Sequence, residues 1–170
     1  METENLYSKV DAKIYISSRL LPDDEAQSSQ SRVAGLETLK REFPAPPVIK
    51  DPSLNEYLGL LNAKMDALLE KSSGETKTSS VMRSRPINIS AGEILFPSDI
   101  EYKIGNKIEI QMVLPMKKPI SLIVIGEIIK ASRALTTARF INIEEDIRQK
   151  IADFVFYRER EILMSEKNVN

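Results

Sequence analysis

The chain has 170 residues, enough for one domain with a smaller attachment, and its 42% apolar and 29% charged residues are typical of globular proteins. A net charge of −1 argues against DNA or RNA binding through a global basic field, and no apolar run is long enough for membrane insertion. Without cysteine or histidine the chain lacks disulfides, thiolate zinc sites and the usual nucleophile–base pairs, so we expect a cytoplasmic, non-catalytic protein without metal or cofactor.

Residues 1–52 are interpreted as an N-terminal extension with short regular patterns. Residues 13–17 are compatible with a short strand. Residues 31–43 carry apolar side chains at near-helical spacing, which indicates a short amphipathic helix. The prolines that follow, Pro44, Pro46 and Pro47, end that helix and predict a stiff, extended connector.

Residues 53–70 predict a helix with a heptad pattern. Ser53 followed by Glu56 predicts a capping box at its start. Alternating spacings of four and three then define an apolar seam formed by Leu54, Leu58, Leu61, Met65 and Leu68. The seam is compatible with packing on the rest of the chain and with self-association as a dimer or tetramer, and the two alternatives stay open. Residues 71–81 are polar and predict a flexible linker.

From residue 82 the pattern changes to short strands separated by turns. The strands that we expect cover residues 82–89, 94–97, 107–114, 120–129 and 135–140. Gly126 interrupts the longest of them and predicts a bulge or bend. Strands at this spacing indicate a small antiparallel barrel, so the fold class is mainly β.

A last helix is predicted to close this barrel domain, which spans residues 82–163 and leaves 164–170 as a tail. Asn142 is the expected N-cap residue, with Glu145 at the capping-box position. The apolar stripe expected to face the barrel consists of Ile143, Ile147, Ile151, Phe154 and Val155.

The order of these parts resembles a PilZ domain, a bacterial six-stranded antiparallel barrel with a C-terminal helix. The matching pieces are short stretches at residues 88–92, 105–110, 114–115, 126–129, 138–140 and 156–160. Residues 61–69 also resemble the heptad helix of an atypical, oligomer-forming branch of this family.

The resemblance implies a link to cyclic di-GMP, a bacterial second messenger. The family binds it with Arg-x-x-x-Arg in a flexible segment before the first strand and Asp/Asn-x-Ser-x-x-Gly at the first turn. This chain keeps Asn88 and Ser90, but its glycine lies one place early, at Gly92, and Glu93 occupies the family's glycine position.

The arginine pair of the family is missing from the linker at residues 71–81. The nearest substitutes are Arg83 and Arg85, which share one face if they lie in a strand. Guanidinium groups bind phosphates through paired hydrogen bonds and stack on bases, so losing them weakens nucleotide binding.

We therefore expect a signalling adaptor of the cyclic di-GMP pathway that binds the nucleotide weakly or not at all. It would act through an unidentified protein partner and through homo-oligomerisation by the heptad helix. The alternative is a functional receptor whose ligand-binding residues are Arg83, Arg85, Asn88, Ser90 and Gly92. No pattern supports an enzyme, because solvation and helix dipoles explain the carboxylate pairs.

Overall fold

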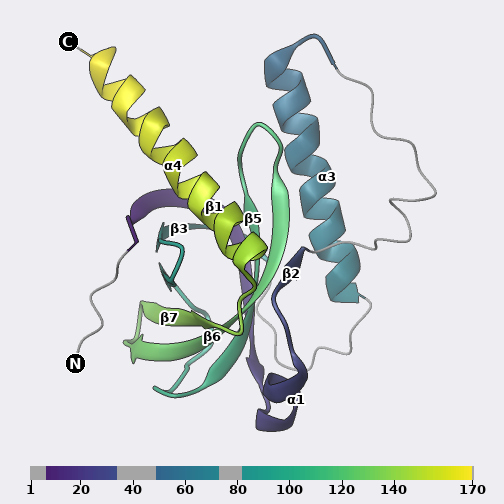
Figure 1. The fold of residues 1–170 in the computed structure, drawn as a ribbon, viewed down its shortest axis with the longest axis vertical. Helices are drawn as coiled ribbons and strands as arrows, with labels where there is room; N and C mark the ends of the chain where they lie inside the picture. The colour runs from purple at the N-terminus through teal and green to yellow at the C-terminus, as the bar shows by residue number, and fades with distance from the viewer. Residues whose placement is uncertain (1–6, 34–48, 73–81, 170) are drawn as a thin grey trace.

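The computed structural model describes residues 7–33, 49–72 and 82–169, and its strands form one antiparallel sheet that closes on itself (Figure 1). The strands are β1 (Val10–Leu21), β2 (Arg32–Val33), β3 (Arg83–Ile89), β4 (Glu93–Phe96), β5 (Lys107–Leu114), β6 (Ile120–Ala131) and β7 (Thr136–Ile141). Their order is β2-β6-β5-β1-β3-β4-β7, and a β6–β7 pairing closes six of them into a barrel with β2 as an extra strand on β6. The predicted mainly β, six-stranded barrel is confirmed.

The first barrel strand, β1, comes from the predicted N-terminal extension. It pairs with β3 on one side and with β5 on the other, so it is as central as any strand of the barrel. The sequence indicated only residues 13–17 as a strand; buried and exposed positions alternate from Val10 to Ile16, and the alternation ends where Ser17 and Ser18 are both buried. The barrel therefore starts at Val10 and not at residue 82, which corrects the predicted boundary.

Several predicted segments differ from the structure or lie outside the described residues. Arg32–Val33 is a strand, so the predicted helix at residues 31–43 is wrong at its start, and its remainder lies outside the described residues. Most of the predicted linker at residues 71–81 also lies outside them.

The barrel interior is filled by branched side chains of β1, β3, β5 and β6, and helix α4 (Glu145–Lys167) covers one end of it (Figure 1). The predicted helix stripe is confirmed: Ile147, Ile151, Phe154 and Val155 are buried and Ile143 packs partly on the core. The predicted cap is wrong. Asn142 has φ +50°, and Glu144 is the N-cap residue, without a side-chain capping bond.

The longest strand predicted from the C-terminal region, β6, carries its irregularity after Gly126. In the pairing of β6 with β7, the register shifts between Ile128 and Lys130 of β6. Gly126 itself lies opposite Phe140, and a Cβ there would approach the Cβ of Ala138 to 3.0 Å. The glycine is thus required for close packing of the two strands, while the bulge sits a few residues later.

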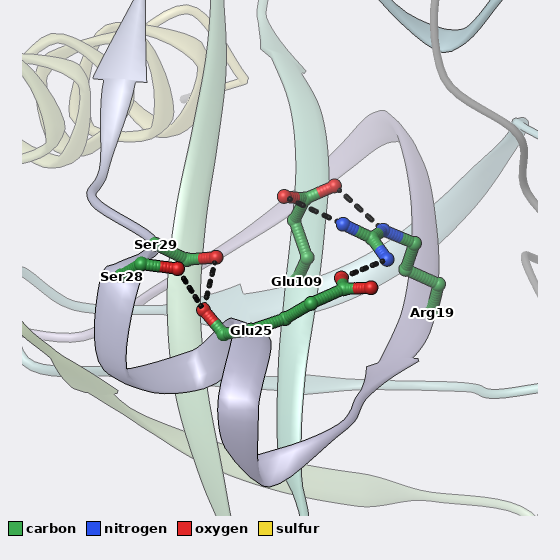
Figure 2. Close-up of polar contacts among 5 residues, drawn as sticks. All are labelled: Arg19, Glu25, Ser28, Ser29 and Glu109. Atoms are coloured by element: carbon green, nitrogen blue, oxygen red, sulfur yellow. Dashed lines mark hydrogen bonds and ion pairs between the residues drawn. The ribbon is translucent and has the colours of Figure 1, made fainter.

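Helix α1 (Asp23–Ser28) is fixed to the outside of the barrel by an ion-pair network (Figure 2). Arg19 on β1 donates from Nε to Glu109 on β5 at 3.0 Å and from Nη1 to Glu25 on α1 at 3.0 Å. Burial lowers the pKa of Arg19, but hydrogen bonds and attraction from both carboxylates outweigh it and raise the pKa. The guanidinium therefore stays charged and ties three elements together.

Candidate functional site

The turn between β3 and β4 carries the predicted ligand residues Ser90 and Gly92, and Ser90 closes it from inside. The Ser90 side chain is fully buried, and its hydroxyl accepts hydrogen bonds from the backbone N–H groups of Gly92 and Glu93, both at 3.2 Å. The Ser90 N–H donates to the carbonyl of Glu93 at 2.9 Å. A serine in this position is explained by turn geometry alone.

We expect Ser90→Ala to destabilise the barrel, because it leaves two backbone donors without their acceptor at a buried position. The expected loss in the free energy of unfolding is about 1–3 kcal/mol, measured by urea denaturation. Ser84→Ala, at an exposed position of β3, is the matched control and should stay near the parent value. Equal stability of the two variants would contradict the structural role of Ser90.

The other polar groups of the turn are paired with the chain itself. Asn88 donates from Nδ2 to Asp11 Oδ1 at 2.9 Å across the β1–β3 pair. Glu93, at the glycine position of the family pattern, forms an ion pair with Lys9, which precedes β1. The side chains of Asn88 and Glu93 are therefore both engaged by partners within the chain.

Helix α4 adds a further contact to the same turn. Arg148 donates from Nη1 to the carbonyl oxygen of Ala91 at 3.1 Å. The same guanidinium lies over the Tyr7 ring, with Arg148 Cζ 5.5 Å from the centre of the ring. Tyr7, Lys9 and Arg148 were not among the predicted site residues, because nothing in their local pattern indicates that they meet at this turn.

Arg83 and Arg85 lie on one face of β3, as predicted, but not on the face of Asn88. Successive side chains of a strand point to opposite faces. Arg83 and Arg85 therefore lie on the face of Ile89, which points into the barrel, and Asn88 lies on the other face. Arg85 donates from Nη2 to both carboxylate oxygens of Asp99, at 2.7 and 2.6 Å. At about 3.3 Å per residue, Arg85 and Ser90 lie roughly 16 Å apart along the strand.

The structure also relocates the segment that precedes the first strand of the barrel. Because β1 is that strand, the segment lies before Val10 and is not the linker at 71–81. Residues 1–9 contain one cationic side chain, Lys9, and no arginine. Asn88, Ser90 and Gly92 thus lie at one turn and Arg83 and Arg85 lie further along β3, and nucleotide binding by the five residues stays a prediction.

The second candidate site is helix α3 (Pro52–Ser72), which the sequence predicted as the heptad helix. Asp51 is its cap, because Asp51 Oδ1 accepts from the N–H groups of Ser53 and Leu54 at 2.9 and 3.1 Å. The predicted Ser53 capping box is therefore wrong, and Pro52 takes the first helical position, where its missing N–H costs nothing.

One face of α3, formed by Gly59, Ala63 and Ala67, packs on the outside of the barrel; we call it the inner stripe. Ala63 and Ala67 are buried against Val113 of β5. A Cβ at Gly59 would lie 3.0 Å from Pro119 Cδ, in the loop between β5 and β6. Small residues at every fourth position let the helix backbone approach the sheet closely, and this spacing is a signal in the sequence that could have identified the inner stripe.

The opposite face is the predicted seam of Leu54, Leu58, Leu61, Met65 and Leu68, which we call the outer stripe. Leu61 precedes Ala63 by two residues, or about 200° around the helix at 3.6 residues per turn. Leu54, Leu61, Met65 and Leu68 retain 41% to 55% of their accessible surface, whereas Ala63 retains 4% and Ala67 none. The small face of this helix packs on its own barrel, as one alternative predicted, and the large apolar face is open, so self-association through it stays a prediction.

The sequence matches no family model and no curated protein sequence. Among solved structures, a pathogenic protein from Xanthomonas campestris, a tetrameric PilZ domain self-assembled via an unusual helical bundle, superposes with a TM-score of 0.53 and 13% identity, covering 94% of this chain and 92% of that one. The chain has the PilZ fold. The Bacillus subtilis inhibitor of motility (MotI/DgrA) gives a TM-score of 0.49 at 11% identity, covering 94% of this chain and 52% of that protein.

Membrane-spanning helices and clustered metal ligands are both absent from the described residues. No helix among them is long and apolar enough to cross a membrane. Within the same part of the chain, no three acidic, histidine or cysteine side chains come together as ligands for a metal ion.

Proposed function

We propose that this chain is a self-associating PilZ-type adaptor of the cyclic di-GMP pathway that binds the nucleotide weakly or not at all. The observation that carries the proposal is the division of α3 into a small inner stripe packed on its own barrel and a large apolar outer stripe open to solvent. A bacterial, cytoplasmic protein that contacts a further protein partner belongs to the same proposal.

The size of the outer stripe supports self-association. Fully burying one leucine or methionine side chain contributes about 1.5–3 kcal/mol. Four members of the stripe keep 41% to 55% of their surface exposed, so burying the rest contributes a part of that for each. An isolated helix is only weakly stable in water, because ordering its backbone costs conformational entropy. Here the barrel already holds α3 in helical form, so copies that meet through the outer stripe do not incur that cost again.

The position of α3 leaves the rest of the barrel free for other contacts. It lies against β5 and β6, whereas the turn after β3 lies beyond β1 in the strand order. Figure 1 shows α3 and β3 on different sides of the barrel. The tetrameric Xanthomonas protein has the same fold and assembles through helices, which is the mode that we propose here.

The proposed weak nucleotide binding follows from the contacts around the turn. A dinucleotide with two phosphates needs guanidinium partners, whose charge-assisted bonds contribute about 1.5–3 kcal/mol each. Arg85 is paired with Asp99, and a carboxylate at Glu93 stands where the family has glycine. Displacing the internal pairs would oppose binding further.

Isothermal titration with cyclic di-GMP tests this part of the proposal. We expect no measurable heat, or a dissociation constant weaker than the low micromolar range. A tighter constant that is lost in Arg83→Ala or Arg85→Ala would instead establish the alternative, a receptor that uses these arginines with Asn88 and Ser90.

A further inference from the structure

Two buried polar side chains of the barrel donate hydrogen bonds to the backbone of α3. Gln111 of β5 donates from Nε2 to the carbonyl oxygen of Ala67, and Ser121 of β6 donates from Oγ to that of Ala63. Only 7% of Gln111 and 3% of Ser121 remain exposed. The two strands are neighbours, and the two acceptors lie one helical turn apart.

These bonds are unusual because carbonyl groups in the middle of a helix already accept from the N–H four residues later. A second donor reaches them only where the helix backbone comes close to the sheet, as the inner stripe permits. Two bonds to successive turns fix both the rotation of the helix about its axis and its position along that axis.

A third contact, from the neighbouring strand β1, also holds α3 in this rotation. Lys64 Nζ lies 3.5 Å from the centre of the Tyr15 ring, which holds this ammonium group on the barrel side of the helix. Lys64 directly precedes Met65 of the outer stripe. Its charge is thereby directed away from the surface that copies would share.

We propose that Gln111 and Ser121 are positioning residues for self-association: they hold α3 in the rotation that presents the outer stripe. The inference rests on the proposed function, because the rotation matters only if the outer stripe assembles. Without the two donors, the packing of the inner stripe on the barrel and the Lys64–Tyr15 contact remain, but no hydrogen bond fixes the rotation of the helix. The population of molecules with the outer stripe correctly presented then falls, and assembly weakens with it.

Because the chain contains no cysteine, one introduced cysteine reports on one position. Ala63→Cys, on the inner stripe, is expected to react slowly with a thiol reagent in the otherwise unchanged protein. Adding Gln111→Met and Ser121→Ala should speed that reaction about tenfold or more, since two hydrogen bonds of ordinary strength are lost. The same pair of substitutions should lower the average mass in solution.

Two controls separate helix position from general loosening. Ser31→Ala removes another buried hydroxyl, which accepts from the N–H of Ile125, and should leave Ala63→Cys protected. Ala12→Cys, in the barrel, should stay protected when both donors are removed. Unchanged protection of Ala63→Cys in the absence of both donors would overturn the proposal.

Leu61→Cys separates this inference from the proposed function. If the outer stripe assembles, this thiol is protected at high protein concentration and reacts on dilution. If it reacts at every concentration, self-association by α3 is wrong, and the positioning role for assembly fails with it, even if Gln111 and Ser121 still hold the helix on the barrel.

Discussion

Replacing Leu61 by aspartate is expected to convert the assembled protein to monomers while the barrel stays folded. Leu61 lies near the middle of the outer stripe, so its carboxylate would be buried between copies on assembly. The cost of burying an unpaired charge is several kcal/mol per copy, which exceeds the contribution of one leucine. Because Leu61 is 41% exposed in the single chain, the substitution costs the isolated protein little.

Sedimentation velocity measures this change as a fall to the mass of one chain, 19.2 kDa. Asn62→Asp is the matched control, since it introduces the same charge at the next residue, which is exposed and lies outside the outer stripe. We expect its mass to remain that of the parent. Loss of assembly in both variants would point to net charge and not to the outer stripe.

The largest expected effect on stability is that of Phe154→Ala. Phe154 belongs to α4, and its ring has no exposed surface and packs against the core residues of the barrel. Its removal leaves a cavity where the closing helix meets the barrel, which should cost about 3–5 kcal/mol. Chemical denaturation should show a lower midpoint with a similar slope.

Phe156→Ala provides an internal comparison, because Phe156 lies two residues further along the same helix and is 62% exposed. Its loss should change the free energy of unfolding by less than about 0.5 kcal/mol. Similar effects for the two phenylalanines would contradict the packing of α4 on the barrel.

The C-terminal strands and the last helix could be predicted because their periodicity is simple. Residues 107–114 alternate in sequence and form β5 without a change of boundary. The C-terminal part of β1 could not be predicted, because its alternation ends after Ile16, where Ser17 and Ser18 are both buried. Buried polar residues in succession give no alternation by which the end of the strand could be recognised.

The candidate sites were predicted unequally. The heptad spacing predicted the outer stripe correctly as an apolar face, because helical geometry is local. The contacts at the turn were not predictable, because Lys9, Glu93 and Arg148 come from three distant parts of the chain. The first strand of the barrel was expected at residue 82 and is β1, which begins at Val10. The arginines of the family pattern were therefore sought in the linker at 71–81 and not in the residues before Val10.

Self-association is tested without any substitution by the mass of the chain in solution, measured by light scattering over a dilution series. We expect a multiple of 19.2 kDa at high micromolar concentration, which decreases on dilution if the copies dissociate. A mass of 19.2 kDa at every concentration would show that the proposed assembly is wrong, and the outer stripe of α3 would then remain an open apolar face of a monomer.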